Sequence, residues 1–192
     1  MHNLFTLAPR ESDCSSNDDA ALIQAARTNP TAFGELYKRY LSRVYGYIRS
    51  RLPNDEEAAD VTAQVFLKAW HAFPRYQDRG FPFVSWLFRI ARNALTDVHR
   101  GQRSLLSWES LSELSHPVDP DGPEDQALRK EAHARVRALV ANLEPGKQEV
   151  LLLRFAAGLT LREIACVIGK SESAVHKQLV QTLSLLKEQF YD

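Results

Sequence analysis

The stretch that decides the fold is Gly158-Leu-Thr-Leu-Arg-Glu-Ile-Ala-Cys-Val-Ile-Gly-Lys-Ser-Glu-Ser-Ala-Val-His-Lys177. It predicts a helix of about eight residues, a turn that contains glycine and a longer second helix, which is the plan of a helix-turn-helix. Thr160 and Glu163 have the spacing of a capping box at the start of the first helix. Gly169 supplies the positive φ that the turn requires. Local chemistry therefore predicts a two-helix DNA-binding unit.

The apolar residues of this unit are placed to close the wedge between its two helices. They are Ile164, Ile168 and Val175. Ser171 or Ser173 caps the second helix, whose N-terminus is then free to face a phosphate or base edges. A generic helical hairpin, which uses similar glycine and capping chemistry, is the alternative.

The C-terminal block around this motif is predicted to hold four helices, over residues 124–143, 147–157, 161–168 and from 172 or 173 to 191. The second of them should bury Val150, Leu151 and Phe155. Gly158 is placed to be the left-handed residue that ends it. On the last helix, Lys177 is a candidate phosphate contact and Gln181 a candidate reader of base edges.

The N-terminal block also has helical periodicity. A first helix should start near Asp18 or Asp19 and stop at Asn29-Pro30, and Thr31 should cap a second, long amphipathic helix. Pro53 breaks that helix, and Asn54 or Asp55 starts the next. After a loop over residues 74–82, a fourth helix is predicted over residues 83–100. No strand-like alternation competes, so the fold class is all-α.

The charge pattern divides the chain. The formal net charge is zero, but residues 33–103 hold 12 Lys and Arg against 7 Asp and Glu, whereas residues 104–132 hold 2 against 7. Segments of opposite charge suggest polyanion-facing domains and a solvated linker. We therefore expect a disordered N-terminus (1–18), two small helical domains (19–103 and 124–192) and a flexible acidic linker (104–123) that leaves the domains mobile.

Aromatic and basic side chains interleave at the end of the N-terminal block. Stacking on unpaired bases, with arginines along the backbone, fits that mixture; core packing and ordinary solvated charge are the alternatives. The candidates are Tyr76, Arg79, Phe81, Phe83, Trp86, Arg89, Arg92, Asn93, Asp97 and Arg100.

Several classes of function are excluded. The six histidines have no metal-ligand spacing, no glycine-rich phosphate loop follows a strand, and no catalytic set emerges. We therefore expect no enzymatic activity, no metal and no cofactor. Cys14 and Cys166 are too far apart in sequence to suggest a shared site. With no apolar run long enough to span a membrane and no signal peptide, the protein is expected in the cytoplasm.

Four stretches in order resemble the extracytoplasmic-function (group IV) sigma factors of bacterial RNA polymerase. Residues 33–40 (FGELYKRY), 60–70 (DVTAQVFLKAW), 83–97 (FVSWLFRIARNALTD) and 143–155 (LEPGKQEVLLLRF) resemble family motifs, and the helix-turn-helix follows them. The resemblance implies a promoter-recognition subunit that binds core polymerase, reads the −10 and −35 elements, assists melting and starts transcription of a specific regulon, as in a stress response. It also implies an anti-sigma partner and a linker along the RNA-exit region.

The resemblance also implies roles for residues. The polymerase clamp would be contacted by Asp60, Gln64, Phe66, Lys68 and Trp70, although Ala63-Gln64 stands where the family usually has Gln-Glu. The aromatic and basic candidates above would read the −10 element. The −35 element would be read by Arg162, Lys170, Ser171, Ser173, His176, Lys177 and Gln181.

One departure concerns the recognition helix, which lacks the arginines common in the family. Fewer cations neutralise fewer phosphates, so tight −35 binding is less expected and a protein partner could use this surface. Two other classes of protein remain open from the sequence. A free-standing helix-turn-helix regulator would bind duplex DNA alone as a dimer, and a helical adaptor would bind only protein.

Overall fold

The structure, a computed structural model, describes residues 15–77, 80–101, 135–136 and 138–191, and every regular element in those ranges is helical. The all-α prediction is thus confirmed. The elements are α1 (Ser15–Ala26), α2 (Pro30–Arg49), α3 (Asp55–Ala72), the short 3-10 helix η1 (Phe73–Arg75), α4 (Phe83–Gly101), α7 (Pro145–Phe155), α8 (Leu161–Ile168) and α9 (Glu172–Tyr191). Residues 135–136 and 138–141 are helical as well, whereas the predicted linker lies outside the described residues.

Two helix starts differ from the predictions. Helix α1 begins at Ser15, so the last residues assigned to a disordered N-terminus are helical. Helix α2 is capped by Asn29 rather than Thr31, because the Asn29 side chain accepts a hydrogen bond of 3.0 Å from the Thr31 backbone N–H. Pro30 then occupies the first helical position, where its missing N–H costs nothing.

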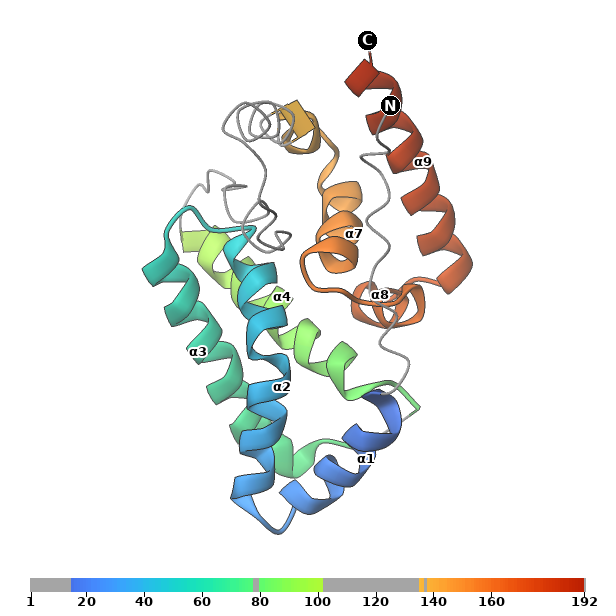
Figure 1. Ribbon diagram of the computed structural model, residues 1–192. Coiled ribbons are helices and arrows are strands. Elements are labelled where there is room, and N and C mark those ends of the chain that lie inside the picture. The colour runs from blue at the N-terminus through green and yellow to red at the C-terminus, as the bar shows by residue number, and fades with distance from the viewer. Residues whose placement is uncertain (1–14, 78–79, 102–134, 137, 192) are drawn as a thin grey trace, which may run out of the picture.

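The N-terminal half is a helical bundle. Figure 1 shows α2, α3 and α4 side by side with α1 crossing one end, and these helices contact one another. Tyr40, Tyr47 and Phe88 are the largest of its fully buried side chains. The Tyr40 hydroxyl donates to the carboxylate of Asp19 on α1. Burial raises the pKa of Tyr40, and this hydrogen bond raises it further by a smaller amount. The hydroxyl therefore stays protonated and links α2 to α1.

The C-terminal half contains the predicted helix-turn-helix. The Thr160 hydroxyl accepts from the Glu163 N–H at 3.2 Å and the Glu163 carboxylate accepts from the Thr160 N–H at 2.8 Å, which is the expected capping box. Gly169 ends α8 with φ of 71°. Ser171 caps α9, since its Oγ accepts from the Ala174 N–H at 3.3 Å. The capping box, the left-handed Gly169 and the Ser171 cap together confirm the predicted helix-turn-helix.

At the end of α7 the predicted backbone conformation is confirmed, but the predicted burial of one side chain is wrong. Gly158 has φ of 64°, and the Leu159 N–H donates to the Leu153 carbonyl at 3.0 Å, as in a glycine-terminated helix. Phe155, however, is 45% exposed instead of buried. It is the last residue of α7, where the chain turns toward α8, so no described helix covers its ring.

Replacing Gly169 by alanine is expected to lower the free energy of unfolding by about 1 kcal/mol, because an L side chain in the left-handed region is strained. A Cβ at Gly169 would meet no atom within 4 Å, so the strain is the main effect. Urea denaturation followed by circular dichroism measures it. Gly34→Ala in α2, which also has open space, is the control and should be neutral or slightly stabilising. An equal loss at both positions would contradict this explanation.

Candidate nucleic-acid interface

The aromatic residues near the start of α4 form a core cluster. Tyr76 and Phe83 are only 6% and 3% exposed, their ring centroids are 5.5 Å apart, and Trp86 lies 4.9 Å from Tyr76. The prediction that Tyr76 and Phe83 stack on bases is wrong for this arrangement, because their rings are already enclosed. Trp86 is half-buried. Phe81 is the ring that fits the prediction, since it is 48% exposed with the Arg89 guanidinium 5.6 Å from its centroid.

The polar candidates on α4 divide between two adjacent faces. Asn93 and Asp97 are exposed, and the Asp97 carboxylate lies 3.5 Å from the Lys68 ammonium of α3. Arg89 and Arg92 instead point toward the C-terminal half. Arg79 lies outside the described residues, and so does the side chain of Arg100.

The predicted polymerase contacts all lie on α3, and all but Phe66 are exposed. Asp60, Gln64 and Lys68 are exposed, and Trp70 is 38% exposed. Phe66 is buried, because its ring packs edge-on against Tyr37 with centroids 4.7 Å apart. Phe66 therefore supports the exposed residues of α3 from below, beside the predicted contact surface, and its role toward the polymerase stays a prediction.

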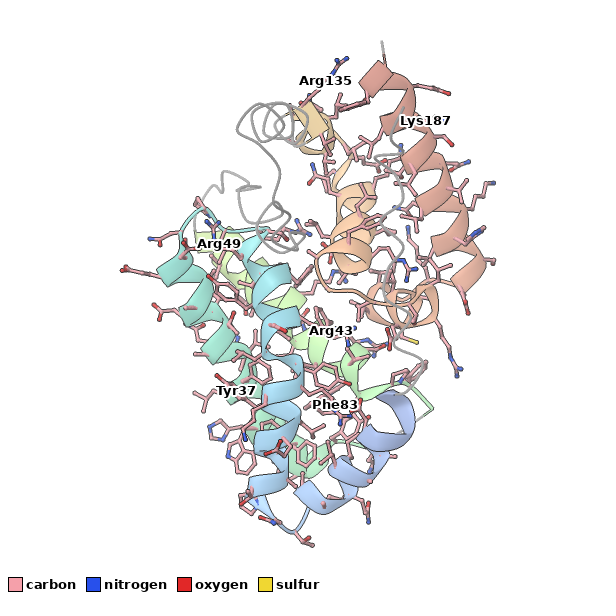
Figure 2. All side chains as sticks on the ribbon, viewed as in Figure 1. Tyr37, Arg43, Arg49, Phe83, Arg135 and Lys187 are labelled. Atoms are coloured by element: carbon pink, nitrogen blue, oxygen red, sulfur yellow. The ribbon has the colours of Figure 1, made fainter. Side chains whose placement is uncertain are left out.

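The same surface includes two apolar residues that the sequence analysis missed as surface residues. Leu67 is 57% exposed and Tyr37 is 39% exposed, and Figure 2 shows Tyr37 on the side of α2 that faces α3. Leu67 falls outside the apolar stripe of Val61, Val65 and Ala69, which are buried. Its position outside this stripe is the sequence signal that could have identified Leu67 as an exposed apolar residue. We call Tyr37, Leu67 and Trp70 the α3 apolar patch.

The predicted −35 residues all lie on the surface of the helix-turn-helix. Two of them also have roles inside the motif: Ser171 caps α9, and the Lys170 ammonium donates to the Gln178 amide at 3.0 Å. The side chains without a described contact that are most open to a ligand are Arg162, His176, Lys177 and Gln181. Ser173 is exposed at the first turn of α9, and its hydroxyl oxygen lies 3.2 Å from that of Ser171.

The two halves contact each other directly, which the sequence analysis did not predict. Arg43 and Arg51 on the α2 side, and Arg89 and Arg92 on α4, reach oxygens of the C-terminal half; we call them the arginine row. Figure 2 shows Arg43 between α2 and the C-terminal helices. Figure 1 shows α8 beside α4, and the two helices are in contact. The sequence gives no sign of these contacts, since an arginine on a helix face looks the same whether it is solvated or paired.

The described residues offer neither a membrane span nor a metal site. No helix in the described ranges combines the length and apolarity that crossing a bilayer requires. The described residues contain no group of three or more His, Cys, Asp and Glu placed to hold a metal ion. Cys166 is a partly buried free cysteine, and Cys14 lies outside the described residues.

Two family profiles match the chain. The profile of Sigma-70 region 2 matches residues 36–105, and that of Sigma-70, region 4 matches residues 133–186, which together make up more than half of the chain. Region 2 thus holds most of α2 with α3 and α4, and region 4 holds α7, α8 and most of α9.

Curated relatives and a solved structure agree with the profiles. The RNA polymerase sigma factor CnrH of Cupriavidus metallidurans is 35% identical over 169 residues, covering 84% of this chain and 88% of CnrH. The ECF RNA polymerase sigma factor SigD of Mycobacterium tuberculosis is 32% identical over 177 residues, covering 89% and 82%. BldN of Streptomyces coelicolor is 34% identical over 169 residues, which cover 86% of this chain but 64% of BldN.

The structural comparison gives the same result. The structure of CnrH in complex with the cytosolic domain of CnrY is similar with a TM-score of 0.64 at 30% identity, covering 88% of this chain and 95% of that one. The two profiles match in the order region 2 and then region 4. The chain belongs to the ECF RNA polymerase sigma factors.

Proposed function

We propose that this sigma factor binds core RNA polymerase, recognises −10 and −35 promoter elements, assists melting and starts transcription of a specific regulon. The observation that carries the proposal is the presence on one chain of region 2, with its exposed aromatic and polar residues, and region 4, with an exposed recognition helix. It acts as an initiation factor and not as an enzyme. The relatives are sigma factors, so the free-standing regulator has no support from them.

For the −10 element, we assign stacking to Phe81 and hydrogen bonding to Asn93. A ring that is 48% exposed can take up an unpaired base, and the cation beside it favours the nearby phosphates. Tyr76 and Phe83 support the loop from the core. Unstacking a base costs a few kcal/mol, and the contacts that the unstacked base makes with the protein offset this cost.

For the −35 element, α9 offers His176, Lys177 and Gln181 on its exposed side. Gln181 suits an adenine edge and Lys177 a phosphate. With so few cations on this helix, region 4 alone should bind duplex DNA with a shallow salt dependence. Tight promoter binding would then depend on region 2 and on the polymerase.

For the polymerase, the proposed contact surface combines the α3 apolar patch with Asp60, Gln64 and Lys68. Exposed apolar side chains surrounded by charged ones are typical of a protein interface. The chain would work in the cytoplasm. CnrH is solved with the cytosolic domain of CnrY, and we propose that this chain is likewise held by an anti-sigma partner.

Run-off transcription with core RNA polymerase and a library of genomic promoter fragments tests the proposal. Promoter-dependent product that requires the chain is expected, and its absence on every fragment would overturn the assignment. Phe81→Ala should lower the initiation rate about tenfold on duplex templates, since base stacking is worth roughly 1–3 kcal/mol. On a template already opened at the −10 element, the loss should shrink. Phe155→Ala removes a similarly exposed ring from region 4 and controls for the loss of a ring itself.

A further inference from the structure

Two members of the arginine row, Arg43 and Arg89, donate to backbone oxygens of region 4. Arg43 donates from Nε to the Ala157 carbonyl at 2.8 Å and from Nη2 to the Gly158 carbonyl at 3.1 Å. Arg89 donates from Nε to the Cys166 carbonyl at 2.9 Å. The Cys166 carbonyl lies in the last turn of α8 and shares the partial negative charge of that helix C-terminus, whereas the Ala157 and Gly158 carbonyls belong to the turn after α7.

One carboxylate completes the contact. Glu149 on α7 is 7% exposed, and its Oε1 accepts from the Tyr47 hydroxyl at 2.7 Å. Arg51 forms an ion pair with the same carboxylate, and the Arg92 Nε lies 3.7 Å from it. All three partners come from region 2. A buried carboxylate whose described partners all belong to the other region is stabilised only while the two regions are together.

These oxygens accept hydrogen bonds from arginine as the phosphate oxygens of DNA do. Arginine binds phosphate through the same donors that here meet carbonyl and carboxylate oxygens. Arg89 and Arg92 also belong to the residues predicted to read the −10 element, Arg89 about one helical turn before Asn93 and Arg92 next to it. Region 4 therefore occupies the basic face of region 2 with acceptors that stand where phosphate oxygens could stand.

The interface is incompletely packed beside its polar contacts, as a reversible contact would be. A cavity of about 300 Å³ lies between Tyr47, Arg51 and Arg92 on one side and Gly146, Glu149 and Lys170 on the other. Interfaces between domains that move resemble transient ones and are more polar than a core. Separation would return Arg89 and Arg92 to water at modest cost, since both side chains are exposed already.

We propose that region 4 closes over the arginine row in the free protein, and that this closed form competes with the phosphate backbone of promoter DNA. Opening frees Arg89 and Arg92 for DNA and separates the two reading surfaces. The inference rests on the proposed function of α4, because it treats that helix as a DNA-binding surface. It adds a self-masking state that needs no second protein.

Glu149→Gln in the full chain tests the proposal, because it removes the charge that holds three donors and keeps the side-chain size. Small-angle scattering of the free protein should show a larger radius of gyration. Affinity for a short fluorescent duplex of arbitrary sequence should rise about tenfold, the effect expected from losing a charge-assisted hydrogen bond in the closed form. Glu144→Gln, which removes the same charge from an exposed side chain at the start of the same helix, should change neither.

Tyr47→Phe is the second variant, since it removes only the hydroxyl donor to Glu149 and should move both readouts in the same direction by a smaller amount. Unfolding profiles of each variant establish that both regions stay folded. A Glu149→Gln protein that is folded, equally compact and no better at binding DNA overturns the inference. If it opens and binds DNA but no chain supports run-off transcription, the proposed function fails while the closed contact stands.

Discussion

Replacing Leu67 by aspartate is expected to lower the affinity of the chain for core RNA polymerase about a hundredfold. Truncating or charging a central interface residue commonly costs 2 kcal/mol or more, and each 1.4 kcal/mol is roughly a factor of ten. Leu67 is 57% exposed, the most of the three residues of the α3 apolar patch, so an acid there would lie in the proposed contact. Leu67→Ala should lose less, because it introduces no charge.

Fluorescence anisotropy of the labelled chain titrated with core enzyme measures this affinity. The exposed position makes a folding defect improbable, and the thermal unfolding midpoint of the variant should match that of the parent. Ala21→Asp places the same charge on an exposed position of α1 and serves as the control. Unchanged affinity in the Leu67→Asp protein would remove the α3 apolar patch from the polymerase interface.

The helix-turn-helix was predictable because its determinants are local. The Thr160–Glu163 capping box and the left-handed Gly169 are fixed by residues within a few positions of each other, and the structure confirms both. The cap of α2 was missed by two residues for an equally local reason. Pro30 is a good first helical residue, which makes Asn29 the cap instead of Thr31.

Burial of particular aromatic rings was less predictable. Tyr76 follows a 3-10 turn and sits among arginines in sequence, which suggested an exposed ring. Its carbonyl accepts a hydrogen bond of 3.1 Å from Arg27, and its ring packs on Phe83. These contacts depend on how Tyr76 packs against the end of α1 and the start of α4, and a pattern along one segment does not contain that information.

The contact between the two regions could not be predicted from the sequence. Arg43 and Ala157 are separated by 114 positions, and the acceptor is a backbone carbonyl that any residue could supply. Glu149 lies in a stretch that resembles a family motif, yet its described partners are in region 2. The acidic linker suggested mobile domains, and this remains a prediction; the structure gives one closed arrangement that such domains can adopt.

Replacing Asp19 by alanine is expected to lower the free energy of unfolding by about 2 kcal/mol, because it leaves a buried hydroxyl without its acceptor and breaks a partly buried ion pair. Asp19 is 6% exposed, and its Oδ1 accepts from the Arg39 Nη1 at 2.6 Å. Its other oxygen accepts from the hydroxyl of Tyr40, which is 1% exposed. Without Asp19, that hydroxyl would be buried with no described acceptor, and α1 would lose its polar link to α2.

Urea denaturation followed by tryptophan fluorescence measures the loss. Asp19→Asn keeps an acceptor oxygen for one donor and should lose less than Asp19→Ala. The exposed pair between Glu35 and Lys38, 2.9 Å apart, is the matched control, because Glu35→Ala breaks an ion pair that is screened by water and is worth about 0.5 kcal/mol. A loss at Asp19 no larger than the loss at Glu35 would show that α1 is held by its apolar contacts alone. Ile23 and Ala26, both buried, would then be the residues that attach it to the bundle.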